Sequence, residues 1–157
     1  MLHPGSILLA MPILEILKPG ITTQSSEETV SIAKSLVSEL PENSILTLEG
    51  DLGTGKTTFV KGLALGFGIH DRITSPTFNI FNCYMKNAKS TTLLHLDAYR
   101  LEGNSGIIDE LMLEDFMKPP FILAIEWPKL LGPIPWKPTL ELTFSIMSQG
   151  THLIRAI

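Results

Sequence analysis

One stretch of the chain restricts the fold more than any other. Its residues are Gly50, Asp51, Leu52, Gly53, Thr54, Gly55, Lys56 and Thr57, with Thr58 directly after them. In the pattern G-x-x-x-x-G-K-[ST], the glycines let backbone N–H groups turn inward around a phosphate chain. The lysine ammonium reaches the β- and γ-phosphates, and the hydroxyl ligates Mg²⁺. The stretch therefore predicts a loop that binds a nucleoside triphosphate.

The residues on either side of this loop support the prediction. Ser44–Glu49, just before it, is short, apolar and partly β-branched, as a buried parallel strand is. Gly66 and Gly68, beyond it, mark the end of a helix. Apolar side chains recur at helical spacing in between: Phe59, Val60, Leu63, Ala64 and Phe67. A glycine-rich surface turn would not account for Lys56 and Thr57 at the first helical turn.

The neighbouring segments predict a mixed sheet. Ser25 and Glu28 have the spacing of a capping box and open a helix. Its inner face is formed by Thr29, Ile32, Ala33, Leu36, Val37 and Leu40. Residues 77–84 and 91–97 are expected to be strands joined by a polar turn at 85–90. Strands joined by so short a turn pair antiparallel, which an all-parallel sheet would not contain.

The C-terminal third predicts one more helix and three more strands. Residues 105–118 have a helical pattern, and residues 121–126 form an apolar strand. Residues 139–146 alternate apolar and polar side chains, and residues 152–157 return, so a terminal hairpin is expected. Gly150 would permit close backbone approach at its bend.

At 157 residues, the chain fits one domain with a substantial core. We expect a single domain over residues 21–157, preceded by an N-terminal extension over residues 1–20. Residues 21–24 are extended, and a surface linker is favoured over a position near a nucleotide base. Met11 is a second candidate for the start of translation. Pro4, Pro12 and Glu15 interrupt the apolar N-terminus, so no secretory signal is expected.

Composition narrows the possible partners and the compartment. The formal net charge is −4, and the nine lysines and three arginines form no cluster, which disfavours strong autonomous binding to RNA or DNA. No apolar run approaches the roughly 18–20 residues needed to cross a bilayer. The single cysteine, Cys83, cannot form an internal disulfide, which suits a reducing cytoplasm.

Two predicted strands end in acids. Asp97 follows the apolar residues 93–96, and Glu126 follows residues 121–125 and precedes Trp127. A phosphate-loop domain places the acid that holds Mg²⁺, directly or through water, at such a strand end. In a chain with a phosphate loop, two strand-end acids that bind a metal ion and water are favoured over two coincidental strand caps.

Three further features each leave two interpretations open. Ser75 and Thr77 flank a proline, and this segment is either a switch loop that senses a γ-phosphate or merely the entry to a strand. His95 shares a strand face with Asp97, so it either contacts the site or is a structural histidine. Arg100 either stabilises transferred charge or forms a structural ion pair, which is the default for a lone arginine.

The ordered combination of four sequence runs resembles the bacterial TsaE (YjeE) ATPases of tRNA threonylcarbamoyladenosine biosynthesis. The runs are the phosphate loop, Thr74-Ser75-Pro76-Thr77-Phe78, His95-Leu96-Asp97-Ala98-Tyr99-Arg100-Leu101 and Glu126-Trp127-Pro128. Many ATPases share the first run, whereas the combination is specific. The resemblance extends from about residue 21 to the C-terminus. Thr54 replaces the alanine often found in the family's loop, and the first ~20 residues have no counterpart.

This resemblance implies a P-loop NTPase-like three-layer α/β/α domain with a mixed sheet, which binds ATP and Mg²⁺ and hydrolyses ATP weakly on its own. Family members work with TsaB and the TsaD threonylcarbamoyl transferase, which modify adenosine 37 of tRNAs. Contact with tRNA is therefore expected through the complex, and no membrane partner is expected.

The family's site residues carry over to matching positions. By this resemblance, phosphate is held by Gly53, Gly55, Lys56, Thr57 and Thr58, and Thr54 keeps the backbone donors of the loop. Mg²⁺ is held by Thr57 and Glu126, with Asp97 as a further candidate. Thr77 belongs to the switch-like loop, and Trp127 borders the nucleotide. Ser26 and Gly150 match positions near the base or ribose.

The expected reaction is attack of water on the γ-phosphoryl group, with charge neutralised by Lys56, Mg²⁺ and backbone N–H groups. Asp97 or Glu126 would orient or deprotonate the water. We expect slow turnover alone and faster turnover with the partners.

A small-molecule kinase with an arginine-rich lid is disfavoured by three scattered arginines. A GTP switch is disfavoured because no Asn-Lys-x-Asp run occurs. A nucleotide-gated adaptor without essential hydrolysis remains an alternative.

Overall fold

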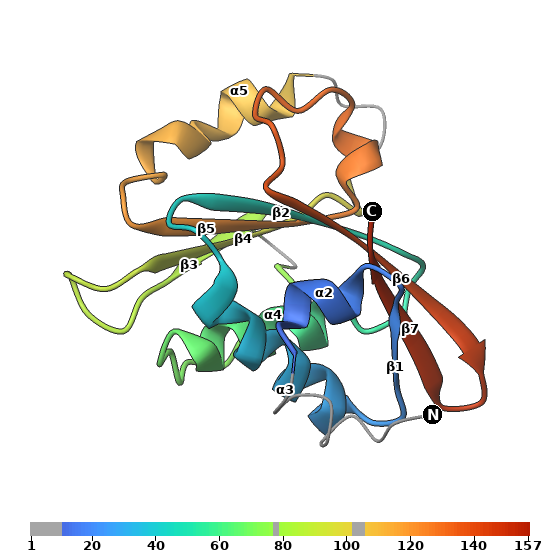
Figure 1. Ribbon diagram of the computed structural model, residues 1–157. Coiled ribbons are helices and arrows are strands. Elements are labelled where there is room, and N and C mark those ends of the chain that lie inside the picture. Colours follow the sequence, from blue (N-terminus) through green and yellow to red (C-terminus); the bar gives the residue numbers. More distant parts are fainter. Residues whose placement is uncertain (1–10, 77–78, 102–105) are drawn as a thin grey trace.

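The computed structural model describes residues 11–76, 79–101 and 106–157, and these residues are organised around one seven-stranded sheet (Figure 1). The strand order across the sheet is β1-β7-β6-β2-β5-β4-β3. The strands are β1 (Ile21–Thr23), β2 (Ser44–Glu49), β3 (Phe81–Tyr84), β4 (Thr92–Asp97), β5 (Phe121–Glu126), β6 (Leu140–Ser148) and β7 (Thr151–Ala156).

The sheet is mixed, as the sequence predicts. In its centre β2 runs parallel to both β5 and β6, and β5 runs parallel to β4. At its margins β3 pairs antiparallel with β4, β7 with β6, and β1 with β7. The two predicted hairpins account for β3–β4 and β6–β7, because such short connections cannot cross over to a parallel neighbour.

Helices cover both faces of the sheet (Figure 1). One face carries α2 (Ile13–Leu17), α3 (Ser26–Leu36), η1 (Val37–Glu39) and α4 (Lys56–Gly66). The other face carries α5 (Ile107–Leu111), η2 (Leu113–Asp115) and η3 (Pro128–Leu131). Each face buries its own hydrophobic cluster. The central strand β2 contributes Leu46 and Leu48 to one cluster and Ile45 to the other, as a strand covered on both faces must.

Local sequence chemistry explains where α3 begins. Ser25 accepts a hydrogen bond from the backbone N–H of Glu28 at 3.1 Å, and the Glu28 carboxylate accepts one from the N–H of Gln24 at 2.7 Å. The predicted cap is therefore confirmed, with the carboxylate reaching one residue beyond the usual capping-box partner. The buried face of α3 then packs against α4, which follows the phosphate loop.

Two predicted elements are shorter than expected. The strand expected over residues 77–84 begins at Phe81 in the structure, and residues 77–78 lie outside the described residues. The helix expected over residues 105–118 is split by Met112, whose φ of +50° is left-handed. In this conformation Met112 caps α5, and its backbone N–H donates to the carbonyl oxygen of Asp109 at 3.3 Å.

The N-terminal part of the described chain packs onto the domain. Residues 21–24 do not form the expected surface linker, because Ile21–Thr23 pairs with β7 as strand β1. Just before it, the helix α2 buries Ile13, Ile16 and Leu17 in the main hydrophobic cluster. Among the described residues, no helix has the length and apolar character needed to span a membrane.

Candidate functional site

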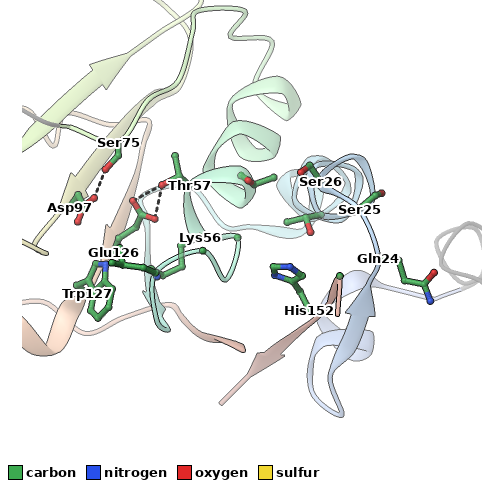
Figure 2. A pocket seen from close by; sticks show the side chains of 16 residues that line it. Gln24, Ser25, Ser26, Lys56, Thr57, Ser75, Asp97, Glu126, Trp127 and His152 are labelled. Atoms are coloured by element: carbon green, nitrogen blue, oxygen red, sulfur yellow. Dashed lines mark hydrogen bonds between the residues drawn. The ribbon is translucent and has the colours of Figure 1, made fainter. Parts of the chain in front are cut away.

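A cavity of about 570 Å³ opens at the carboxyl ends of the central strands (Figure 2). Ligands of open α/β sheets bind at this edge. The lining residues come from both halves of the chain: Gln24, Ser25, Ser26, Thr29, Leu52, Gly53, Gly55, Lys56, Thr57, Thr58, Ser75, Asp97, Glu126, Trp127, Gly150 and His152.

The phosphate loop connects β2 to the start of α4. Gly55 is the N-cap of α4 with a φ of +103°, a conformation that a side chain would strain. The first N–H groups of a helix have no partner within the helix, so the turn that begins at Lys56 presents free donors and the positive end of the helix dipole to the cavity. Loop and helix together form an anion-binding surface.

Thr54 braces the loop from behind. It is 3% exposed, and its hydroxyl donates to the carbonyl oxygen of Asp51 at 2.7 Å. Thr54 is not among the residues that line the cavity. Among the described phosphate-binding positions, Thr54 is thus the one whose side chain points away from the cavity.

Lys56 lies at the centre of the loop. Its ammonium donates to the carbonyl oxygens of Gly50 and Asp51 at 2.5 and 2.7 Å. The same ammonium lies 4.5 Å from the ring centroid of Trp127. Burial lowers the pKa of Lys56 from its usual value, and the negative charges of Glu126 and Asp97, among others, oppose that shift. A neighbouring phosphate would act in the same direction as these carboxylates.

Glu126 and Thr57 form a direct pair across the cavity floor. The Thr57 hydroxyl is 3.0 Å from one Glu126 carboxylate oxygen and 3.1 Å from the other (Figure 2). On its other side Glu126 contacts the ring of His95, with 2.8 Å between Nε2 and Oε2. His95 therefore contacts Glu126, and no hydrogen bond joins it to Asp97, with which it shares a strand face.

Asp97 is held at the same sheet edge. It lies opposite Glu126 in the register of the parallel strands β4 and β5. The Ser75 hydroxyl donates to Oδ2 of Asp97 at 2.5 Å, and the N–H of Tyr99 donates to Oδ1 at 3.0 Å. Ser75 precedes the first residue of β3 by several positions. The Ser75 hydroxyl thus joins an irregular loop to the strand-end acid, while Thr77 lies outside the described residues.

The Trp127 ring lines one side of the cavity, and Tyr99 packs against that ring. Trp127 follows Glu126 with a left-handed φ of +58°. Its ring lies 5.1 Å from that of Tyr99, centroid to centroid. A wall of this kind offers a flat apolar surface beside the Lys56 ammonium.

The sequence predicted only some of the residues on the opposite wall of the cavity. Ser26 and Gly150 line it as the resemblance implies. Gly150 has a φ of +71°, and a Cβ there would meet no atom within 4 Å, so its backbone conformation rather than a close approach requires glycine. His152 was missed: its Nδ1 is 2.9 Å from the carbonyl oxygen of Thr54.

Further lining residues were also missed by sequence reasoning. They are Ser25, Thr29 and Leu52, together with Gln24, for whose segment a surface linker was favoured over a position near the base. The pairing of β1 with β7 brings residues 21–24 beside the terminal hairpin. One signal in the sequence pointed to His152. Side chains alternate along residues 152–157, so His152 shares a strand face with Ile154, which is buried.

The oxygen donors of the site fit Mg²⁺. Thr57 and Glu126 offer a hydroxyl and a carboxylate in contact with each other, and Asp97 stands in the adjoining register position. Within the described part of the chain, no group of three or more His, Cys, Asp or Glu side chains is suited to hold a metal ion alone. Mg²⁺ is commonly held by one or two carboxylates together with substrate phosphates and water, which is the set this cavity would supply.

Comparison with known proteins gives consistent matches. Residues 23–155 match the family model described as Threonylcarbamoyl adenosine biosynthesis protein TsaE. A Borreliella burgdorferi protein named tRNA threonylcarbamoyladenosine biosynthesis protein TsaE is 39% identical over 130 residues, which cover 81% of this chain and 91% of that protein. A Bacillus subtilis protein of the same name is 41% identical over 109 residues, covering 69% and 66%.

A solved structure supports the same fold. The crystal structure of Bacillus subtilis YdiB superposes with a TM-score of 0.66 at 31% sequence identity, covering 86% of this chain and 81% of that chain. Together with the layered mixed sheet, this likeness confirms the α/β fold class that the sequence predicts.

Proposed function

This chain belongs to the TsaE family of threonylcarbamoyl adenosine biosynthesis proteins, and on that basis we propose that it is a magnesium-dependent ATP hydrolase required for threonylcarbamoylation of tRNA adenosine 37. One observation carries the proposal. Lys56 and Thr57 from the phosphate loop, and Asp97 and Glu126 from neighbouring strand ends, line a single cavity. Phosphoryl transfer depends mainly on such positioning and charge neutralisation.

ATP binding is assigned to the loop and the first turn of α4. The Lys56 ammonium donates to the neutral carbonyl oxygens of Gly50 and Asp51. A triphosphate offers negatively charged acceptors, and an ammonium is attracted more strongly to a charged oxygen than to a neutral carbonyl. We therefore expect the ammonium to exchange loop carbonyls for phosphate oxygens when ATP binds.

Hydrolysis is assigned to the acids. Thr57 and Glu126 would hold Mg²⁺, which would neutralise charge on the β- and γ-phosphates. Asp97 or Glu126 would accept a hydrogen bond from the attacking water. The hydrogen bond from Ser75 to Asp97 links this step to the loop that carries Ser75. A change in that loop would therefore move a carboxylate of the site.

The partners we propose are TsaB and TsaD, with tRNA reached through their complex. Among the sixteen described residues that line the cavity, none is arginine. An arginine supplied to a phosphoryl-transfer site can raise kcat by ~10³–10⁵-fold. The site is accordingly expected to turn over slowly alone and faster when a partner orders the Ser75 loop or supplies a cation.

Two variants test the proposal. Calorimetry should detect ATP binding to the unaltered protein, tighter with Mg²⁺ than without it, and none to Lys56→Ala, which loses the central cation. Glu126→Gln should bind ATP within a few fold of the unaltered protein, while its turnover with TsaB and TsaD falls at least ~100-fold. Glu141→Gln, at an exposed position on β6, is the matched control and should retain turnover. No heat of binding in the unaltered protein would reject the proposal.

The lack of arginine among the lining residues also favours a second function. In this alternative the protein is a nucleotide-gated adaptor, and ATP binding alone drives assembly with the partners. A reconstituted tRNA modification assay separates the two functions. Full modification with Glu126→Gln, despite blocked hydrolysis, would support the adaptor.

A further inference from the structure

A buried histidine lies behind the acid of the phosphate site. His95 is 0% exposed and Glu126 is 2% exposed. The His95 ring contacts Oε2 of Glu126 through Nε2 at 2.8 Å, and Glu126 in turn accepts the Thr57 hydroxyl. A continuous hydrogen-bonded chain therefore runs from the interior of the sheet to the first turn of α4.

The register of the strands explains how His95 reaches Glu126. His95 pairs with Ala124, and Asp97 pairs with Glu126, across the parallel strands β4 and β5. The imidazole thus spans from β4 to the acid two residues further along β5. Glu126 and Thr57 line the cavity, whereas His95 does not. A group bound in the cavity would meet the carboxylate and leave the ring untouched.

Hydrogen-bond accounting fixes the direction of this contact. The Glu126 carboxylate accepts, so Nε2 of His95 carries the proton. Nδ1 is buried and has no hydrogen-bond partner among the described residues. A lone pair on Nδ1 leaves no donor unpaired, whereas an N–H there would be a buried donor without an acceptor, at a cost of about 1–3 kcal/mol. The geometry corresponds to the Nε2–H tautomer.

The contact also constrains the carboxylate. Among the described residues, two side chains donate hydrogen bonds to Glu126: the Thr57 hydroxyl and the His95 ring. The His95 ring does not line the cavity, so its hydrogen bond to the carboxylate would persist when a ligand contacts Thr57. Removal of the ring would leave Thr57 as the one described side-chain donor to Glu126.

We propose that His95 is a positioning residue of this site, whose Nε2–H orients the Glu126 carboxylate toward Thr57 and the Mg²⁺ position. This inference rests on the proposed function, because it assigns a role within the same site. Partners that orient a metal-binding side chain typically contribute ~10–100-fold to metal affinity or activity.

The test compares His95→Leu, which removes the donor, with His95→Gln, which places an amide N–H near the position of Nε2. Leu93→Val is the control, because Leu93 is a fully buried residue on the same face of β4. Electron paramagnetic resonance measures Mn²⁺ affinity in the presence of ATP. Calorimetry in EDTA measures metal-free ATP binding, and a coupled assay measures turnover with TsaB and TsaD.

For His95→Leu, we expect Mn²⁺ affinity and turnover to fall ~10–100-fold while metal-free ATP binding stays within about twofold. His95→Gln should recover both to within about fivefold of the unaltered protein, and Leu93→Val should alter neither. Equal Mn²⁺ affinity in His95→Leu and the unaltered protein would overturn the inference while leaving the ATPase proposal intact. An unaltered protein that binds no ATP would instead reject the proposed function.

A measurement on the unaltered protein covers the case in which His95→Leu does not fold. Nitrogen-15 spectra of the histidine rings should show a proton on Nε2 of His95 and none on Nδ1, and Glu126→Gln should shift the Nε2 signal. A proton on Nδ1, or a signal indifferent to Glu126→Gln, would contradict the positioning role.

Discussion

Gly62 in the middle of α4 offers a quantitative test of how this domain is packed. Replacing a helical glycine by alanine normally stabilises a helix by about 1 kcal/mol. At this position, however, an added Cβ would lie 2.4 Å from the carbonyl oxygen of Val30 and 2.6 Å from Cβ of Ala33. Both atoms belong to α3, which packs directly on α4. Two effects of opposite sign therefore compete.

The structure indicates which effect is larger. Ordinary van der Waals contact begins near 3.4 Å, so α3 and α4 would have to separate by about 1 Å from the 2.4 Å contact. A carbonyl inside a helix cannot swing aside as a flexible side chain can. Overpacking a core costs about 1–3 kcal/mol, and a backbone clash lies at the upper end. Subtracting the propensity gain leaves a net loss of about 2 kcal/mol.

Urea unfolding followed by circular dichroism measures this loss. Gly62→Ala should unfold at lower urea concentration with an unchanged slope. Lys61 is exposed on the same helix, so the difference between Lys61→Ala and Lys61→Gly reports helix propensity without the clash. ATP affinity should also fall, because Thr29 on α3 and Lys56 on α4 line the same cavity. A Gly62→Ala protein as stable as the unaltered one would refute this reasoning.

Three further predictions concern the cavity. The lowered pKa of Lys56 means that the folded protein loses this proton at lower pH than the unfolded chain does. The free energy of unfolding should therefore rise with pH between the lowered pKa of Lys56 and 10.5. In urea unfolding, the stability advantage of Lys56→Met over the unaltered protein should shrink over that pH range. A difference between the two proteins that stays constant with pH would contradict the assignment. Because Trp127 lies 4.5 Å from the Lys56 ammonium, Mg²⁺ and ATP should change its fluorescence in a Trp136→Phe background, and an unchanged spectrum at saturation would count against movement of the ammonium. His152→Ala should weaken ATP binding about fivefold in calorimetry, since a hydrogen bond of about 1 kcal/mol to the phosphate loop is lost. His70→Ala, at an exposed position, is the control, and equal affinities for the two variants would exclude that contribution.

Most of the backbone plan could be predicted from local patterns. The alternation of a buried strand, a glycine loop and an amphipathic helix predicted β2, the phosphate loop and α4. The short polar turn after Tyr84 predicted the β3–β4 hairpin, and the Gly150 bend predicted β6–β7. These elements depend on hydrogen bonds and side-chain periods within a few residues, which the sequence displays directly.

Errors arose where a distant partner or a single left-handed residue decides the conformation. Residues 21–24 contain too little pattern to predict a strand, and their strand exists because β7 offers a free edge. Met112 ends α5 in a left-handed conformation, although the apolar face of the helix continues past it. Neither outcome is visible in hydrophobic periodicity.

The sequence by itself determined the inventory of the site: the anion-binding loop, its lysine and hydroxyl, and two acids at strand ends. Those residues were identifiable because a phosphate loop is a local structure and because a polar residue closing an apolar strand is conspicuous. Only the tertiary structure decided how these residues are positioned relative to one another. The parallel register of β4 and β5 sets Asp97 beside Glu126 and carries His95 to the Glu126 carboxylate. The antiparallel return of β7 brings His152 to the phosphate loop. These contacts join residues 31 and 98 positions apart. They depend on how the strands pair, and burial across the whole sheet fixes that pairing.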